Sequence, residues 1–310
     1  MKIIKQLLIL SIVFATPFVA QSQQRPQFTQ YMYNSIAYNP AFAGSRQSMV
    51  INLLHRSQWV GIDGAPTTQT LSAHTLIPEL KNVGVGLSVI RDQLGFESTT
   101  DAFANFSYTI DLDDDQNYRL AFGVRGGATN YNLNNELLND PDAGQDDFLN
   151  TVNFSWLPNV GVGLYFRGES FYVGASLPNI FTSEDNKTGF TSFDRSSIFI
   201  NAGALIDIRN SNLQFKPSFL IKYTDGAPIS ADLSALFFIN EKLWIGGAYR
   251  LGDSFAAIVD FKITESITAG YAYDFITSRL TNFTSGSHEI LLSYKFDFLR
   301  PVCKCKNLYN

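Results

Sequence analysis

This 310-residue sequence has little of what most catalytic or metal-binding sites require. Its three histidines, His55, His74 and His288, stand neither beside a Gly-x-Ser-x-Gly turn nor in a metal-binding helix pattern. Its two cysteines, Cys303 and Cys305, lie in a tail that offers no further ligands for a two-thiolate metal site. We therefore expect no enzyme activity, no cofactor and no metal. A Ser-His-acid arrangement, which is assembled only in space, stays open as the alternative.

Charged residues are also scarce, at 16% of the chain, and the net charge is -5. The chain has no basic tract that would hold phosphates, so nucleic acid is not expected as a partner. After residue 20 no apolar run reaches the roughly 20 residues that a membrane helix needs. The composition, 45% hydrophobic and 14% aromatic, nevertheless differs from that of a disordered chain.

The first residues have the form of an export signal. Two lysines precede an apolar run over residues 7–20, and Ala20 and Ser22 are small residues at the two positions that a signal peptidase reads. The apolar run is too short for a retained anchor helix. Residues 1–22 are therefore expected to be a signal peptide, and the mature chain to begin near Gln23.

Apolar side chains alternate with small or charged ones in about fourteen segments between residues 46 and 298. In the last segment two sets fall on opposite faces, Ile290, Leu292, Tyr294 and Phe296 on one and Glu289, Ser293, Lys295 and Asp297 on the other. Because side chains on a strand point alternately to opposite sides, this spacing builds a sheet with one apolar and one polar face. Behind an export signal, the pattern predicts an all-β fold, a transmembrane antiparallel β-barrel of about 14 strands whose apolar face meets lipid.

A secreted β-sandwich or propeller is the alternative fold, and it would bury the apolar face against another sheet. The proposed lumen face carries charges of both signs, which can pair across the interior or remain hydrated: Arg125, Lys216, Lys222, Asp232, Asp260, Lys262, Asp274, Glu289 and Lys295. This favours the barrel.

The lengths of the connections predict an orientation, because membrane barrels have short periplasmic turns and longer outer loops. If the first strand runs outward, the periplasmic turns are all short, near 78–82, 113–117, 167–170, 209–212, 240–242 and 264–266. The long connections, near 132–158, 179–194 and 279–286, then all fall on the outer rim. An even number of strands also returns the C-terminus to the periplasm, where residues 299–310 form a tail.

Residues 23–45 lack the alternation of the barrel, residues 46–298. Asn39-Pro40 and Gly44 are turn formers, and several aromatic residues give a compact segment something to bury. We expect a short plug or rim element folded into the periplasmic mouth. The alternative is a mobile leader.

Several motifs resemble those of the PorP/SprF family of Bacteroidota outer-membrane proteins. They are Phe28-x-x-Tyr31-x-x-Asn34, Asn39-Pro40-Ala41-x-Ala43-Gly44, Arg56-x-Gln58-Trp59-x-Gly61, Gly64-Ala65-Pro66-x-Thr68, Asp92-x-x-Gly95 and Ser176-Leu177-Pro178-Asn179. The resemblance covers essentially the whole mature chain, except for the tail after Phe298. For two of these residues we expect an architectural role rather than direct contact with a ligand. Arg56 is expected to be a lumen charge paired with an acid, and Trp59 to lie in an interfacial belt. Gly61, Gly64 and Pro66 are expected to fix a tight outer loop.

The resemblance implies a barrel of the type IX secretion and gliding-motility machinery. Members are similar in architecture to the long-chain fatty-acid transporter barrels. The resemblance implies that they receive or retain large secreted surface proteins, such as adhesins with a C-terminal sorting domain. It also implies links to periplasmic peptidoglycan-binding or ring components. The alternative function is a channel for hydrophobic or small polar solutes.

Two further segments are candidates for contacts with partners. The first outer loop carries an acidic cluster, Asp140, Asp142, Asp146 and Asp147, which fits a basic sorting domain, a calcium ion or plain solvation. The tail places Cys303 one residue from Cys305, so a disulfide between them would be strained and readily reduced. There are two alternatives to such a disulfide. The thiols are incidental in a basic tail, or the tail docks a periplasmic partner.

Overall fold

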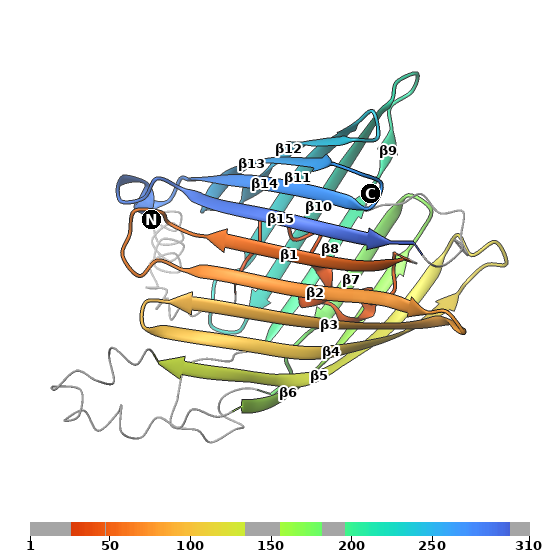
Figure 1. Ribbon diagram of the computed structural model, residues 1–310, viewed down its shortest axis with the longest axis horizontal. Coiled ribbons are helices and arrows are strands. Elements are labelled where there is room, and N and C mark those ends of the chain that lie inside the picture. The colour runs from red at the N-terminus through yellow and green to blue at the C-terminus, as the bar shows by residue number, and fades with distance from the viewer. Residues whose placement is uncertain (1–25, 47, 134–155, 182–195, 298–310) are drawn as a thin grey trace, which may run out of the picture.

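The computed structural model describes residues 26–46, 48–133, 156–181 and 196–297, and its main element is one antiparallel sheet closed into a barrel (Figure 1). The strands are β1 (Met49–Ser57), β2 (Thr67–Ile77), β3 (Leu80–Leu94), β4 (Glu97–Asp111), β5 (Arg119–Leu133), β6 (Trp156–Arg167), β7 (Phe171–Leu177), β8 (Ser197–Ala204), β9 (Ile206–Asp207), β10 (Leu213–Thr224), β11 (Ser230–Ile239), β12 (Leu243–Arg250), β13 (Ser254–Lys262), β14 (Ile267–Ile276) and β15 (Ser287–Phe296).

The barrel is closed and has fourteen strand positions. Apart from β8 and β9, each strand pairs with its neighbours along the chain, the first strand β1 pairs with the last strand β15, and β10 pairs with β11 to complete the ring. The short β9 and its neighbour β8 both pair with β10, so these two of the fifteen strands share one position, interrupted at Leu205. The predicted fold class is therefore confirmed. Within the described residues, no helix is long and apolar enough to cross a membrane.

The side chains that alternate along each strand face alternately into the lumen and toward the outer surface. In β15, Glu289, Leu291 and Ser293 are buried, whereas Ile290 and Leu292 are exposed on the outer surface. The charges assigned to the lumen from the sequence lie on the inward face: seven are buried, namely Arg125, Lys216, Lys222, Asp232, Asp260, Asp274 and Glu289, and Lys262 and Lys295 are half-buried.

The two rims differ as the sequence predicts. At the rim where β1 begins, called here the short-turn rim, the connections span residues 78–79, 112–118, 168–170, 208–212, 240–242 and 263–266. The opposite, long-connection rim joins strands through residues 58–66, 134–155, 178–196 and 277–286, the last with a 3-10 turn η4 (Arg279–Asn282), and through three shorter connections. Strands β5 and β6 extend further toward this rim than expected, to Leu133 and from Trp156.

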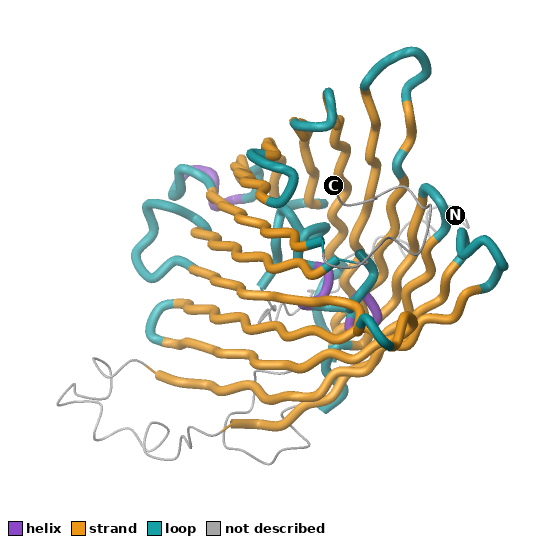
Figure 2. The backbone as a smooth tube through the Cα atoms, turned by 45° about the vertical axis from the view of Figure 1, so that its right-hand side comes forward, coloured by secondary structure: helices purple, strands orange, loops and turns teal. Residues whose placement is uncertain are grey.

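Residues 26–46, called here the plug, lie inside the barrel (Figure 2). They contain two 3-10 turns, η1 (Ser35–Ala37) and η2 (Pro40–Phe42), and every residue from 28 to 44 is buried. The sequence predicts a place in the periplasmic mouth for this segment. In the structure it extends from one rim of the barrel to the other. Its first residues lie beside the β1–β2 connection at the long-connection rim, and the carbonyl of Ser45 accepts a hydrogen bond from Arg167 at the short-turn rim.

Candidate functional site: the plug and the mouth cavity

The first half of the plug is bound by an ionic cluster on the wall. The carboxylate of Glu289 accepts hydrogen bonds from the backbone N–H groups of Thr29 and Gln30, at 2.8 and 2.7 Å. The hydroxyl of Thr29 donates to Asp274, at 2.8 Å. The guanidinium of Arg56 bonds to both carboxylates and to the Thr29 hydroxyl. These residues, called here the clamp, join β1, β14 and β15 to the plug.

The clamp is deeply buried, with Arg56 2% exposed and Glu289 0% exposed. A buried ion pair stabilises little over a well-packed apolar replacement, but removing one partner leaves an uncompensated charge, which costs about 3–5 kcal/mol. The expected role of Arg56 as a lumen charge paired with an acid therefore agrees with its contacts. The clamp makes the position of the plug depend on this arginine.

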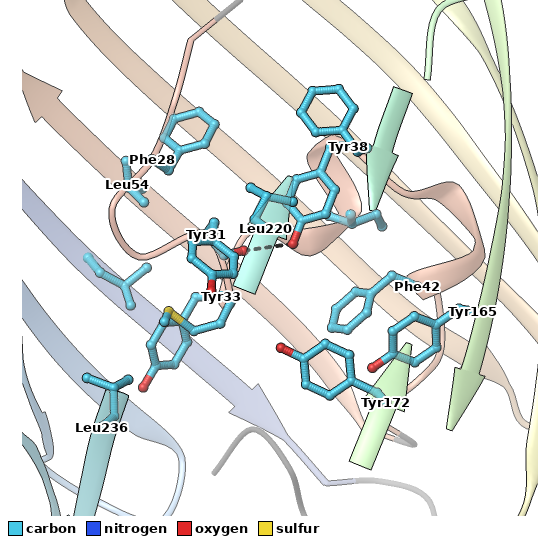
Figure 3. Close-up of a cluster of buried hydrophobic side chains, with 14 of the residues drawn as sticks. Phe28, Tyr31, Tyr33, Tyr38, Phe42, Leu54, Tyr165, Tyr172, Leu220 and Leu236 are labelled. Atoms are coloured by element: carbon cyan, nitrogen blue, oxygen red, sulfur yellow. Dashed lines mark hydrogen bonds between the residues drawn. The ribbon is translucent and has the colours of Figure 1, made fainter. Parts of the chain in front are cut away.

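Tyrosines continue the contact deeper in the lumen (Figure 3). The hydroxyl of Tyr31 bonds to Ser218 and Ser234, at 2.9 and 3.1 Å, and that of Tyr33 donates to Asp260. Burial raises the pKa of Tyr31 to about 12, so its hydroxyl stays protonated. Their rings pack in one core with Leu236 and other apolar residues of the wall. This part of the plug therefore lies against the wall of β10, β11 and β13.

Asparagines hold the turns of the plug. The side chain of Asn34 donates to Thr70, and the side chain of Asn52 donates to the backbone of Tyr33, at 2.8 Å. The side chain of Asn39 accepts from the backbone N–H of Ala41 and donates to a backbone carbonyl of β6, both at 3.0 Å. Because buried backbone groups need partners, these side chains supply what a plug without regular structure lacks.

Inward glycines of the wall make room for the second half of the plug. A Cβ at Gly123 would overlap the backbone of Pro40 and Ala41, and a Cβ at Gly163 would overlap the side chain of Asn39. The glycines on the inward face of β5 and β6 therefore form sockets into which the turn η2 fits. The alternation in the sequence predicts glycines on the inner face of the strands, with apolar residues on the outer face. It does not show that these glycines contact the plug.

The last residues of the plug are fixed at the wall of β2 to β4. Ser107 donates to the carbonyl of Ala43, at 2.7 Å, and the N–H of Gly44 donates to His74, at 3.3 Å. Gly44 has a φ of +72°, and a Cβ there would meet Leu76. Glycine is therefore required at this position both for its backbone conformation and for the close approach.

Arg125 connects the plug to the connection after β7. Its guanidinium donates to the backbone carbonyls of Ala37 and Pro178 and to the side chain of Asn179, and it lies 3.9 Å from the ring centroid of Phe103. The neighbouring Ser176 donates to the carbonyl of Tyr38, at 2.8 Å. The Ser176-Leu177-Pro178-Asn179 motif therefore contacts the plug both directly and through this arginine.

A cavity of about 460 Å³ opens above the plug at the long-connection rim and is called here the mouth cavity. Five of the residues predicted as family motif positions line it, namely Arg56, Gln58, Trp59, Pro66 and Asp92. Pro26 and Gln27, the first described residues of the plug, line it as well. Trp59 is among the lining residues, and its expected place in an interfacial belt stays a prediction.

The charges around the mouth cavity are mainly acidic. Asp92, Glu97 and Asp101 face inward on β3 and β4, and in the register Asp92 lies opposite Thr99, midway between the other two acids. Hydroxyls of Thr68 and Thr129 donate to two of these carboxylates. Of the two arginines that line the cavity, Arg56 is paired with Asp274 and Glu289, which lie outside the lining. Arg250 is paired with Asp232, also outside the lining, and with the lining residue Asp253.

Two tight turns frame the mouth cavity. Gly61 and Gly64 in the β1–β2 connection have φ values of +102° and +71°, as expected of a tight loop. The N–H of Gly95, between β3 and β4, donates to the carbonyl of Gly64, at 2.8 Å. Two motif positions that are far apart in sequence therefore meet at the rim.

Some of the predicted residues do not come together, and others lie outside the residues that the structure describes. His55 and His74 belong to neighbouring strands but are on opposite faces: His55 is exposed opposite Gln69, and His74 is buried opposite Val50. The acidic cluster Asp140, Asp142, Asp146 and Asp147, the signal peptide, Cys303 and Cys305 lie outside the described residues.

Comparison with known proteins identifies one family. The family described as "Type IX secretion system membrane protein PorP/SprF" matches residues 20–294, which includes the plug and all the strands except the end of β15. No curated protein matches the sequence.

Solved structures with a similar chain trace include three outer-membrane proteins or porins at 8–10% identity. The outer membrane protein Omp33 of Acinetobacter baumannii has 9% identity and a TM-score of 0.49, with 81% of this chain and 100% of that chain covered. The KdgM porin has 10% identity and a TM-score of 0.38, with 80% and 99% covered. A mutant of the Rh. blastica porin has 8% identity and a TM-score of 0.36, with 80% and 99% covered.

Proposed function

Because this chain belongs to the PorP/SprF family of type IX secretion system membrane proteins, we propose that it is a non-enzymatic docking barrel of that machinery. Its task is to help secrete, dock or retain a large surface protein, such as an adhesin of the gliding machinery. The barrel stands in the outer membrane with its long-connection rim outside and its C-terminus in the periplasm.

The observation that carries this proposal is the plug. Residues 28–44 are all buried inside the barrel, and they are held on one side by the clamp and on the other by the glycine sockets. A fourteen-strand barrel is wide enough to hold water, unlike the packed interior of eight strands. A plug that is bonded to most of the wall opposes solute flow. The channel for hydrophobic or small polar solutes is therefore the less favoured function.

The mouth cavity is the place where we expect the secreted partner to make contact. It is concave, and motif residues from two separate parts of the sequence converge on it. Its acidic wall fits a basic segment of the partner, as does the acidic cluster at residues 140–147. The short-turn rim and the tail after residue 298 face the periplasm in this orientation, where peptidoglycan-binding or ring components are the expected partners.

Co-purification from cells in mild detergent, with mass spectrometry of the captured proteins, tests the docking role. The wild-type barrel is expected to retain a large surface protein, and Asp92→Lys, which reverses one charge in the mouth cavity, is expected to lose it. Asp114→Lys is the matched control, because Asp114 is an exposed acid in the β4–β5 turn at the opposite rim. Equal capture by Asp92→Lys and the wild type would exclude the mouth cavity as the docking site.

Two deletions test the other contacts separately. Removal of residues 133–157 is expected to reduce the retention of the adhesin at the cell surface, and undiminished retention would exclude that loop. Removal of residues 300–310 is expected to reduce the capture of periplasmic components while leaving the surface protein bound. An unchanged periplasmic capture would exclude the tail as a docking segment.

A further inference from the structure

On the outer surface of the barrel, one polar row of paired side chains includes an arginine. The register places His55 of β1 opposite Gln69 of β2, Gln69 opposite Arg91 of β3, and Arg91 opposite Thr100 of β4. Directly paired side chains on one face of a sheet lie about 4.5–5.5 Å apart, so these four are neighbours. Neighbouring strands are about 4.8 Å apart, so the row extends over roughly 14 Å.

Arg91 is exceptional among the outward-facing residues. Of the charged strand residues in the described part of the chain, three are exposed, and the other two, Lys81 and Asp207, stand at the short-turn rim. Elsewhere the exposed residues of the strands are mostly apolar or aromatic. A single guanidinium on an apolar membrane surface therefore needs a physical reason.

The row marks the edge of the lipid-facing surface. The next row toward the short-turn rim is entirely apolar, with Leu53 paired to Leu71 and Leu71 paired to Val89, and these three side chains are 39–47% exposed. The next row in the other direction is polar, with Ser57 paired to Thr67 and Thr67 paired to Gln93. The polar row of Arg91 therefore lies at the level where hydrocarbon gives way to lipid headgroups.

Arg91 has no ion-pair partner within the described residues, unlike Arg56, Arg119 and Arg250 of the lumen. Other ion pairs of the described residues join Lys262 to Glu265 and Lys295 to Asp297. No inward-facing acid can reach Arg91, because the wall separates it from the lumen. Arg91 is exposed on the outer surface, and guanidinium donors match phosphate oxygens in charge and geometry.

We propose that the row His55–Gln69–Arg91–Thr100 binds the phosphate of a lipid headgroup in the leaflet at the long-connection rim. The guanidinium supplies the charge, and the amide and hydroxyl of its two neighbours supply further hydrogen bonds. The acyl chains lie against the apolar row of Leu53, Leu71 and Val89. The site is independent of the docking function, because it lies on the outer surface and uses none of the residues of the mouth cavity.

Native mass spectrometry of the full chain in detergent micelles tests the site with two probes of equal chain length, phosphatidylglycerol and diacylglycerol. We expect the wild type to bind phosphatidylglycerol more tightly than diacylglycerol, which has no phosphate. Arg91→Gln is expected to weaken the binding of phosphatidylglycerol about tenfold, which equals about 1.4 kcal/mol. Arg91→Lys keeps the charge, so its affinity for phosphatidylglycerol is expected to fall less than that of Arg91→Gln.

Arg279→Gln is the matched control, because Arg279 is an exposed arginine at the same rim but lies in the β14–β15 connection rather than on a strand. It is expected to bind phosphatidylglycerol as the wild type does. Gln69→Leu tests the same row without changing the charge and is expected to weaken binding by a smaller factor. Wild-type binding by both Arg91→Gln and Gln69→Leu would overturn the proposal. Displacement of the lipid by inorganic phosphate in excess would assign the row to a soluble anion and overturn the lipid assignment.

Discussion

Arg56 and Glu289 are direct partners in the ladder between β1 and β15, with Nη1 of the arginine 2.9 Å from Oε2 of the glutamate. These are the first and last strands of the barrel, so the ion pair lies at the seam where the chain closes on itself. The same carboxylate accepts the backbone N–H groups of Thr29 and Gln30. Closure of the barrel and placement of the plug are therefore coupled through one glutamate.

The first prediction concerns this clamp. Arg56→Gln is expected to lower the free energy of unfolding by about 3–5 kcal/mol, because two buried carboxylates lose their counter-charge. Fluorescence-monitored unfolding of the barrel in detergent measures the loss. Arg56→Lys keeps a charge but not the forked donors, so we expect an intermediate value. A wild-type stability for Arg56→Gln would mean that the clamp does not hold the plug.

The second prediction uses two glycines of the same strand that face opposite sides. Gly123→Val is expected to destabilise the barrel by about 1–3 kcal/mol, the range for overpacking, because its side chain would overlap the plug. Gly126→Val is the control, since a Cβ at Gly126 meets nothing within 4 Å. Thermal unfolding of both variants in one detergent gives the comparison. Equal effects would show that the socket is not specific to the plug.

The third prediction concerns conductance. The wild type is expected to conduct ions poorly in planar lipid bilayers, because the plug fills the lumen. Deletion of residues 26–44 is expected to give stable open steps, since the emptied interior of a fourteen-strand barrel holds water. Preserved strand content in circular dichroism is the control for folding. A folded deletion variant without increased conductance would contradict the role of the plug as the barrier.

The fourth prediction concerns Asn39, which caps the turn η2. Asn39→Ala removes the acceptor of the Ala41 N–H and the donor to the carbonyl of Leu164, at 3.0 Å each. A buried polar group left without a partner costs about 1–3 kcal/mol, so we expect a loss in this range. Asn212→Ala is the control, because this asparagine is exposed in the β9–β10 turn. Thermal unfolding measures both, and equal midpoints would contradict the capping role.

Much of the barrel is predictable from the sequence because the period of a strand is two. The set Ile290, Leu292 and Tyr294 is exposed and Glu289 is buried, as the alternation requires. The lengths of the connections likewise predict which rim carries the long ones. These features are local, so no knowledge of distant residues is needed to read them.

The candidate site could be predicted only in part. The motif residues were identified as a set, but nothing in the sequence shows that Gln58, Pro66 and Asp92 line one cavity. The abundance of tryptophan at membrane interfaces predicts an interfacial place for Trp59, but it gives no sign that this residue also lines the mouth cavity. Arg125 was recognised as a lumen charge, whereas its bonds to Ala37 and Asn179 depend on the fold of the plug.

The pattern of residues along the chain is enough to predict the wall of the barrel: about fourteen strands, an apolar outer face, a polar inner face and two unequal rims. These follow from side-chain alternation and the lengths of connections, which are local properties of the chain. The contacts of the plug inside the lumen follow only from the folded structure. The partners of the plug, such as Glu289 for Thr29 and Gly123 for Ala41, are 260 and 82 positions away in the chain. Only closure of the barrel brings these residues together.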